Sequence, residues 1–231
     1  MDLHPLAPRV LAGIDEAGRG PVLGPLVVAG VATEDPERLA EMGCRDSKVL
    51  SPDRRRALDR ALRADAGVQI EVRAIEAETI DAEREGRSLN DIELERFAEV
   101  ARALGSPAVV VDAADVDAKR FGRDLAARLP PGTRVVSEHK ADANHAIVAA
   151  ASIVAKVARD AAVAELARRL ERRLGMALGS GYPSDPQTQA FLRAWVERFG
   201  DLPEGTRRSW STARDLLAPR PARLDDFGGR R

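Results

Sequence analysis

The chain has 231 residues, 44% hydrophobic and only 3% aromatic, enough for one large domain, or a domain with a small appended subdomain, around an aliphatic core. Its 36 Lys and Arg are balanced by 37 Asp and Glu, which excludes a uniformly basic nucleic-acid binder but not a local basic groove. A single cysteine, Cys44, excludes an internal disulfide and, with only three His, argues against a structural zinc site.

The sequence carries no sign of export or membrane insertion. No signal-peptide pattern opens it, and the longest uncharged apolar stretch, 146–155, is too short to span a bilayer. We therefore expect a cytoplasmic protein that acts as a monomer and has no membrane partner.

Five strands are predicted from short apolar or alternating segments, at residues 11–14, 26–32, 68–75, 108–111 and 134–137. Helical patterns fill the intervals, at residues 53–64, 89–104, 118–129, 143–174 and 185–199. Early strands close together, followed by strands separated by helices, indicate an α/β fold with a mixed sheet flanked by helices.

The predicted elements divide the chain into three parts. Residues 1–174 form the main domain. The proline-containing segment 175–217 is predicted to form a small helical C-terminal subdomain against the main sheet. Residues 218–231 have the composition of a flexible tail.

Acids and glycines follow the first predicted strand. Asp15 and Glu16 stand side by side, and Gly18, Arg19 and Gly20 come next. Carboxylates are the oxygen ligands that Mg²⁺ and Mn²⁺ prefer. Glycines let main-chain N–H groups approach a sugar-phosphate closely, and the planar guanidinium of Arg19 fits phosphate. This segment therefore indicates a metal site beside a nucleic-acid backbone.

Two other interpretations compete with this one. The segment can be an ordinary solvated turn, which is the commonest role of such residues. Alternatively, the spacing of Gly13 and Gly18 matches half of a nucleotide-binding P-loop. That interpretation fails because Arg19 and Gly20 stand where the loop needs Lys and then Ser or Thr.

Two further aspartates suit a site. Asp112 closes the apolar strand 108–111, at the carboxyl edge where functional side chains project. Asp142 precedes the long helix, and its simplest role is a helix N-cap or first-turn acid. Neighbouring strand residues point to opposite faces, so either the first strand ends at Glu16, or one of Asp15 and Glu16 acts through its main-chain carbonyl.

Several short motifs follow one another along the chain, in this order: GIDEAGRGP (13–21), DSK (46–48), VDAAD (111–115), HKAD (139–142), AASI (150–153), AKV (155–157) and GSGYPSDP (179–186). In this combination, from about residue 10 to residue 217, the chain resembles the type 2 ribonuclease H family (ribonuclease HII), and archaeal members more than bacterial ones.

The resemblance implies a ribonuclease H-like catalytic domain over residues 1–174. It implies an endoribonuclease that hydrolyses RNA in RNA/DNA hybrids and cleaves 5′ of ribonucleotides embedded in duplex DNA, leaving 5′-phosphate and 3′-hydroxyl ends. It also puts Asp15, Glu16, Asp112 and Asp142 at the family's four metal-binding acids, which hold two Mg²⁺ or Mn²⁺ ions during catalysis, with Asp15 bridging them. Four crowded carboxylates repel one another unless cations bind.

Substrate contacts are implied as well. In this family the Gly18-Arg19-Gly20 loop uses its backbone to read the 2′-hydroxyl that separates RNA from DNA. The tyrosine at Tyr182 stacks on the sugar after the ribonucleotide, although a lone tyrosine can also be a core residue with its hydroxyl at the surface. Five more residues are candidate contacts to the strand, each of which can instead be an ordinary surface residue: Arg45, Lys48, Lys140, Ser152 and Lys156.

The tail adds a possible partner. Related archaeal enzymes carry a C-terminal Gln-x-x-Leu-x-x-aromatic-aromatic motif that docks on the sliding clamp. Leu224 and Phe227 match part of it, but Pro221 replaces the Gln and Gly228 the second aromatic. The segment is either a degenerate clamp motif or a plain tail.

Two rival functions fit part of the pattern. The first is another two-metal enzyme on the same architecture, such as a junction resolvase or transposase. The glycine loop and Tyr182, which read ribose in the family, disfavour it. The second is a non-catalytic hybrid-binding module, which four intact acids disfavour.

Overall fold

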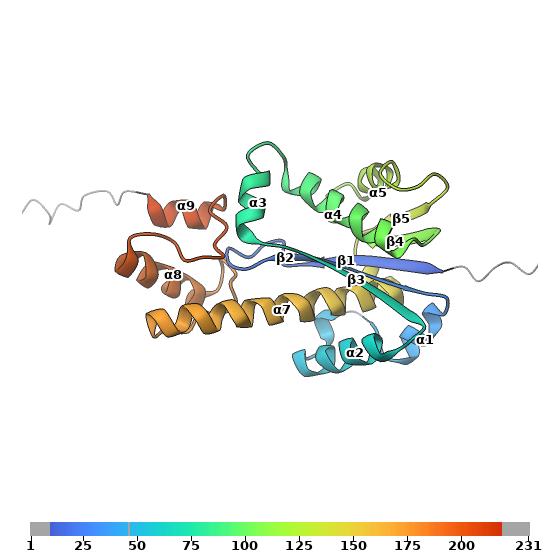
Figure 1. The fold of residues 1–231 in the computed structure, drawn as a ribbon, viewed down its shortest axis with the longest axis horizontal. Coiled ribbons are helices and arrows are strands. Elements are labelled where there is room, and N and C mark those ends of the chain that lie inside the picture. Colours follow the sequence, from blue (N-terminus) through green and yellow to red (C-terminus); the bar gives the residue numbers. More distant parts are fainter. Residues whose placement is uncertain (1–9, 46, 219–231) are drawn as a thin grey trace, which may run out of the picture.

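The computed structural model describes residues 10–45 and 47–218, which form a five-stranded mixed sheet with helices on both faces (Figure 1). The strands are β1 (Leu11–Ala17), β2 (Leu26–Thr33), β3 (Val68–Ile75), β4 (Ala108–Asp112) and β5 (Arg134–Glu138). In the order β3-β2-β1-β4-β5, the β1–β2 and β2–β3 pairs are antiparallel, and the β1–β4 and β4–β5 pairs are parallel. The mixed sheet predicted from the sequence is confirmed.

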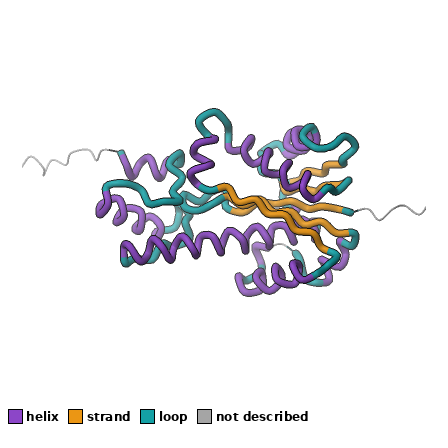
Figure 2. Tube along the Cα trace, in the orientation of Figure 1, coloured by secondary structure: helices purple, strands orange, loops and turns teal. Residues whose placement is uncertain are grey.

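Helices form a layer on each face of this sheet (Figure 2). They are α1 (Pro36–Glu41), the 3-10 helix η1 (Ser47–Val49), α2 (Pro52–Ala64), α3 (Ala77–Glu83), α4 (Leu89–Leu104), α5 (Ala118–Ala126), α6 (Ala141–Asn144), α7 (Ala146–Leu174), α8 (Pro186–Phe199) and α9 (Ser211–Leu217). The long α7 covers one face together with α1 and α2, α4 and α5 cover the other, and α8 and α9 lie beyond one end of the sheet. Among the described helices, none is long and apolar enough to cross a membrane.

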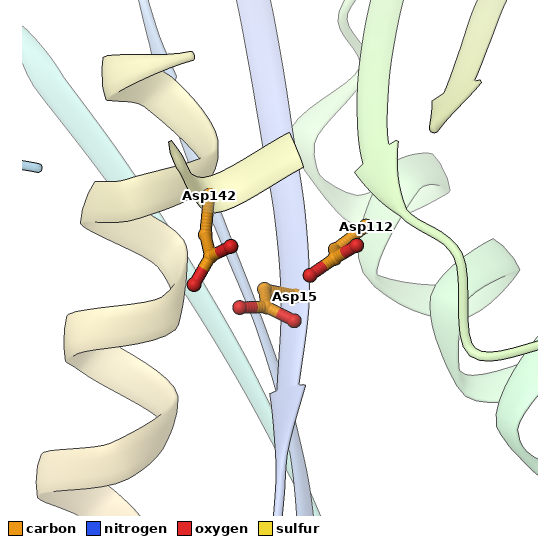
Figure 3. A group of neighbouring side chains, drawn as sticks. All are labelled: Asp15, Asp112 and Asp142. Carbon is orange, nitrogen blue, oxygen red and sulfur yellow. The ribbon is translucent and has the colours of Figure 1, made fainter. Parts of the chain in front are cut away.

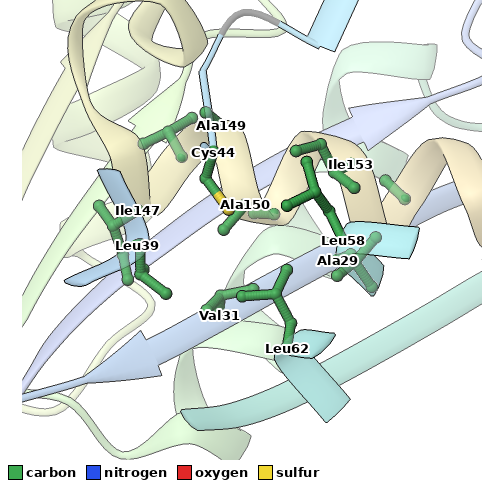
Figure 4. Packing of buried hydrophobic residues seen from close by; sticks show 14 of the residues in the cluster. Ala29, Val31, Leu39, Cys44, Leu58, Leu62, Ile147, Ala149, Ala150 and Ile153 are labelled. Atoms are coloured by element: carbon green, nitrogen blue, oxygen red, sulfur yellow. The ribbon is translucent and has the colours of Figure 1, made fainter. Parts of the chain in front are cut away.

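The interface between α7 and the sheet consists of small aliphatic side chains (Figure 4). Ala149 and Ala150 of α7 are fully buried in it. A Cβ added to Gly13 of β1 would come within 2.5 Å of the backbone carbonyl of Ile147, so this close approach requires glycine. The first turns of α7 are thereby held directly against β1, next to Asp15.

The C-terminal helices have a hydrophobic cluster of their own. Phe191 and Trp195 of α8 pack with Leu166 and Leu170, which belong to the second half of α7. Leu23, from the loop after β1, joins the same cluster. Helices α8 and α9 are therefore packed both against α7 and against the loop that follows the first acids.

Some predicted boundaries were wrong. β1 continues past residue 14 to Ala17, because it stays paired with β2 up to the Ala17–Val27 pair. The short elements α1, α3 and η1 escape prediction because each buries only one or two side chains, such as Leu39 in α1, and so shows no helical period.

The predicted helix 143–174 is in fact two helices. His145 between α6 and α7 has an extended backbone (φ −129°, ψ 114°), which interrupts an alanine-rich stretch that looks continuous in sequence. The predicted helix 118–129 ends earlier, as α5, and Ala127 caps it.

Candidate active site

Three carboxylates from separate parts of the chain meet at the carboxyl ends of β1 and β4 (Figure 3). Asp15, Asp112 and Asp142 each offer one oxygen within 4.8 Å of the others. The parallel ladder between β1 and β4 ends at the pair Ile14–Val111, so Asp15 and Asp112 are the next residues of the two strands. This edge of the sheet is where α/β proteins bind ligands.

Asp142 reaches this group from the short helix α6. The preceding Lys140 takes the left-handed conformation (φ 58°), and the amide of Ala141 then donates to Oδ1 of Asp112 at 3.3 Å. Oδ2 of Asp142 accepts from Nζ of Lys48 at 3.4 Å. Oδ1 of Asp142 is buried and has no hydrogen-bond partner among the described residues. The side chain of Asp142 thus contacts the other acids and Lys48 rather than capping the helix.

The fourth predicted acid lies beside this group rather than in it. Glu16 is not among the three carboxylates that come within 4.8 Å of one another. Burial raises the pKa of Glu16 well above its usual value, and the negative charges of Asp15 and Asp112 raise it further. Its Oε2 is buried without a hydrogen-bond partner in the described chain. Because β1 runs on to Ala17, the alternative in which the strand ends at Glu16 is wrong.

The electrostatics of the group suit a cation. Burial raises the pKa of Asp15 to about 6, although a hydrogen bond from Ser152 and the charge of Lys156 lower it. Burial also raises the pKa of Asp112, against the hydrogen bond from the Ala141 amide. Two of the three aspartates are buried, and in the described part of the chain no donor satisfies Oδ1 of Asp142 or Oε2 of Glu16. Such a group fits a hard divalent cation, which supplies both the missing charge and the missing ligation.

An open cleft of about 670 Å³ begins beside Glu16, the one of the four acids that lines it. It lies between the loop after β1, the middle of α7 and the loop before α8, and its lining includes Glu16, Gly18, Gly20, Arg159 and Tyr182. Tyr182 is 41% exposed, so it is not a core residue. A Cβ added to Gly20 would lie 3.8 Å from Cε1 of Tyr182, so the tyrosine ring is next to the glycine loop.

The guanidinium of Arg19 is engaged by the protein. It forms an ion pair with Glu93, a fully buried carboxylate of α4, and its Nη2 donates to Oδ1 of Asn90 at 2.6 Å. Nδ2 of Asn90 in turn donates to Asp115 at 2.9 Å. The guanidinium of Arg19 was expected to contact a phosphate. In the structure it contacts Glu93 and Asn90 of the protein instead.

Ser152 and Lys156 share a face of α7, as predicted, but they contact protein atoms. Nζ of Lys156 donates to the hydroxyls of Ser152 and Ser47, both at 2.6 Å, and the two hydroxyls lie 2.9 Å apart. Ser152 is fully buried, and its side chain forms a hydrogen bond with Asp15. Of the other candidates, Arg45 and Lys140 are exposed.

Two buried arginines near the site escaped the sequence analysis. Arg159 is 6% exposed, lines the cleft with its guanidinium 5.2 Å from the Tyr182 ring, and has Nε and Nη2 without hydrogen-bond partners among the described residues. Its position three residues after Lys156, on the same helix face, is a signal that could have found it. Arg207 is fully buried beneath the glycine loop, and no local pattern separates it from Arg208.

The fold and the carboxylate group together define a nuclease of the ribonuclease H class. The family model for ribonuclease HII matches residues 12–213. Ribonuclease HII of Methanothrix thermoacetophila is 44% identical over 90% of this chain and 98% of its own length, and that of Archaeoglobus fulgidus is 42% identical over 94% and 99%. The chain therefore belongs to the ribonuclease HII family, as the motifs predicted.

Solved structures agree with this assignment. The crystal structure of ribonuclease H2 from Pyrococcus horikoshii superposes with a TM-score of 0.80 at 40% identity, over 90% of this chain and 97% of that one. The PCNA:RNase HII complex from Archaeoglobus fulgidus gives 0.80 at 42% identity, over 94% and 100%. The protein is thus an endoribonuclease that acts on RNA/DNA hybrids and depends on a divalent metal.

Proposed function

We propose that this enzyme cleaves RNA in hybrids and also cuts 5′ of single ribonucleotides in duplex DNA, leaving 5′-phosphate and 3′-hydroxyl ends. The observation that carries the proposal is the meeting of Asp15, Asp112 and Asp142, with Glu16 beside them, at the edge of a cleft lined by a glycine loop and an exposed tyrosine. These acids would hold two Mg²⁺ or Mn²⁺ ions, and the chemistry that such ions supply is activation of the attacking water and stabilisation of the leaving oxygen.

The residues around the cleft would select the substrate. The main-chain amides of the Gly18–Gly20 loop would donate to the 2′-hydroxyl, the group by which RNA differs from DNA. Tyr182 would stack on the following sugar, a role that its exposed ring supports. Arg159 would meet a phosphate, since the residue lines the same cleft and its buried Nε and Nη2 have no hydrogen-bond partner among the described residues.

The exposed basic residues would hold the strand outside the cleft. Arg45, Lys48 and Lys140 are exposed and belong to segments that flank the acids. Lys48 lies close to Asp142, which supports a phosphate contact near the metal site. Arg45, Lys48 and Lys140 are the same residues that the family resemblance implies as contacts to the strand.

One assay tests the proposal. Duplex DNA with a single ribonucleotide, labelled at either end, is incubated with the protein with and without Mg²⁺ or Mn²⁺. We expect metal-dependent cleavage on the 5′ side of the ribonucleotide, a 3′-hydroxyl that a polymerase extends, and no cleavage of the all-DNA duplex. Cleavage of the all-DNA duplex, or of a branched DNA junction, would favour the resolvase-like rival instead.

A sliding clamp is the proposed protein partner. The related Archaeoglobus fulgidus enzyme is found in a complex with PCNA. Leu224 and Phe227, the residues that match the clamp motif, lie outside the described part of the chain. Removing residues 218–231 should abolish binding to a clamp ring in calorimetry while turnover on short duplexes stays within about twofold. Unchanged clamp binding would contradict this assignment.

A further inference from the structure

The loop Gly18–Gly20 is held by one buried side chain, Arg207, from the segment between α8 and α9. Nη2 of Arg207 donates to the carbonyl oxygen of Gly18 at 2.6 Å, and Nη1 to that of Arg19 at 3.0 Å. Its Nε donates to the carbonyl of Gly24 at 3.1 Å, and the guanidinium lies over the ring of Trp210, 4.9 Å from its centre. Arg207 is fully buried, and among the described residues it forms no ion pair with a carboxylate. Its partners are therefore backbone carbonyls of the loop.

The contact continues one residue further along the loop. Nε1 of Trp210 donates to the carbonyl of Gly20 at 3.3 Å. Three successive carbonyls, from Gly18 to Gly20, thus face the segment that joins α8 to α9. Burial lowers the pKa of Arg207 to about 10, with a further contribution from the charge of Arg159, so the guanidinium is still charged at neutral pH.

The orientation of the carbonyls fixes the orientation of the amides. In a trans peptide the C=O and the N–H of one unit point in opposite directions, and the described chain has no cis peptide. The Gly18 carbonyl shares its unit with the Arg19 amide, and the Arg19 carbonyl shares its unit with the Gly20 amide. Both amides therefore point away from Arg207, and neither has an acceptor among the described residues.

The other side of the loop borders the cleft. Gly18, Arg19 and Gly20 line it, whereas Arg207 does not. Gly18 has a φ of 92°, and a Cβ there would come within 2.6 Å of Cδ of Arg159, so the conformation that exposes the amides also depends on glycine. Adjacent main-chain N–H groups that point the same way form a recognised binding surface for oxygen acceptors.

We propose that Arg207 is a positioning residue for ribose recognition: by holding the carbonyls of Gly18 and Arg19, it aims the amides of Arg19 and Gly20 at a 2′-hydroxyl in the cleft. This inference rests on the proposed function, in which the loop reads the sugar. The structure also indicates why arginine is needed. The planar guanidinium spans the two carbonyls at once, which a single ammonium does not reproduce.

The test compares Arg207→Lys with the matched control Arg208→Lys, whose side chain is half exposed and pairs with Asp201. Fluorescence anisotropy with Ca²⁺ gives the affinity of each protein for a duplex with one ribonucleotide and for the same duplex in all-DNA form. Circular dichroism melts establish that each variant is folded. For Arg207→Lys we expect the preference for the ribonucleotide duplex to fall about tenfold, the worth of a lost hydrogen bond, with affinity for the all-DNA duplex unchanged. Arg208→Lys should keep the wild-type preference.

The outcomes separate the two proposals. A wild-type protein that neither prefers nor cleaves the ribonucleotide duplex would sink the proposed function itself. If the wild type prefers the ribonucleotide duplex to the all-DNA duplex, and a folded Arg207→Lys protein shows the same preference, only the role of Arg207 would be overturned. An equal loss on both duplexes would make Arg207 a purely structural residue.

A measurement on the wild type covers the case in which Arg207→Lys does not fold. The amide resonances of Arg19 and Gly20 should exchange rapidly with solvent in the free protein, because they have no acceptor. Adding the ribonucleotide duplex with Ca²⁺ should protect both amides, and the all-DNA duplex should not. Protection in the free protein, or the same protection by both duplexes, would contradict the inference.

Discussion

Asp15 and Asp112 lie side by side because the last pair of the β1–β4 ladder joins the residues immediately before them. The parallel register therefore places a buried carboxylate, that of Asp15, beside the half-buried carboxylate of Asp112 before any metal is present. Asp142 completes the group from α6, a helix that follows the neighbouring strand β5. Like charges brought together in this way cost folding free energy, which a bound cation recovers.

Replacing Asp112 with Asn should separate stability from activity. We expect cleavage of an RNA/DNA hybrid to fall by at least about a thousandfold, because metal-assisted catalysis supplies several kcal/mol of transition-state stabilisation. The metal-free protein should be as stable as the wild type or more so at pH 7, because one charge leaves the crowded group. Cleavage assays and thermal melts in EDTA check both parts. Asp124→Asn, at an exposed position of α5, is the control. Near-normal activity of Asp112→Asn would contradict the metal assignment.

The stability of the metal-free protein should fall as pH rises from about 4 to about 6. The folded-state pKa of Asp15, about 6, lies above the ordinary value of 3.8, so the folded state binds the proton more tightly and loses stability when it ionises. Two pKa units correspond to at most about 3 kcal/mol. Asp115 and Asp185, whose pKa values are lowered to about 2, act in the opposite sense and below this interval.

Urea denaturation in EDTA at several pH values measures this effect. Asp15→Asn should reduce the fall in stability between pH 4 and pH 6. The rest of this fall should come from Glu16 and Asp112, whose pKa values are also raised. Saturating Mn²⁺ should restore stability at pH 7 in the wild type. A wild-type stability that rises between pH 4 and pH 6 without metal would contradict the expected direction.

The sequence predicted the parts of this molecule that depend on local patterns. The strands Val68–Ile75 and Ala108–Asp112 stand out because β-branched runs and alternation mark them directly. Asp112 was predicted for the site because it closes a buried strand. The break at His145 was not predictable, because an alanine-rich segment favours helix on both sides of it.

Contacts between residues far apart in the chain could not be predicted from the local sequence. Glu93 looks like one of many acids on a helix, yet it is fully buried against Arg19, 74 positions earlier in the chain. Arg207 lies 189 positions from Gly18 in the chain, and the segment around Arg207 has the composition of an ordinary loop. Such contacts depend on how the layers pack, and a single sequence with no pairing information does not encode them visibly.

Tyr182→Ala should weaken cleavage at a single embedded ribonucleotide more than cleavage within a long RNA run. Loss of stacking costs about 1–3 kcal/mol per contact by analogy with aromatic–base stacking, and only the junction substrate offers the DNA-like sugar next to the cut. The kcat/KM values for both substrates give the comparison, and Tyr182→Phe, which keeps the ring, is the control. Equal losses on the two substrates would make Tyr182 a packing residue of the cleft wall.

Glu93→Gln should destabilise the protein by about 2 kcal/mol. Breaking a buried ion pair usually costs more, but the Arg19 side chain is 36% exposed, and solvent screens the charge left behind. Glu95→Gln, two positions along the same helix, removes the surface pairs of Glu95 with Arg102 and Arg128 and should change stability by less than about 0.5 kcal/mol. Urea denaturation of both variants makes the comparison, and equal effects would contradict a special role for the buried pair.

Binding of an RNA/DNA hybrid should depend steeply on salt despite the formal net charge of −1. The basic residues near the acids are the reason, because each phosphate that they neutralise releases condensed counterion. Arg19 is excluded from this set by its pairing with Glu93. Arg159 replaces it, because this residue lines the cleft and two of its buried nitrogens have no hydrogen-bond partner among the described residues. The other members are Arg45, Lys48, Lys140 and Lys156.

About four such contacts predict a log–log slope of roughly −3 to −4, at about −0.9 per phosphate. Fluorescence anisotropy over a salt series measures it, with Ca²⁺ used in the expectation that it fills the site without supporting cleavage. Arg159→Gln should reduce the slope by about one unit, since it removes one phosphate contact. Arg208→Gln should leave the slope unchanged, because Arg208 does not line the cleft and pairs with Asp201. A wild-type slope near zero would mean that no basic groove holds the strand, and the proposed path of the substrate over these residues would be wrong.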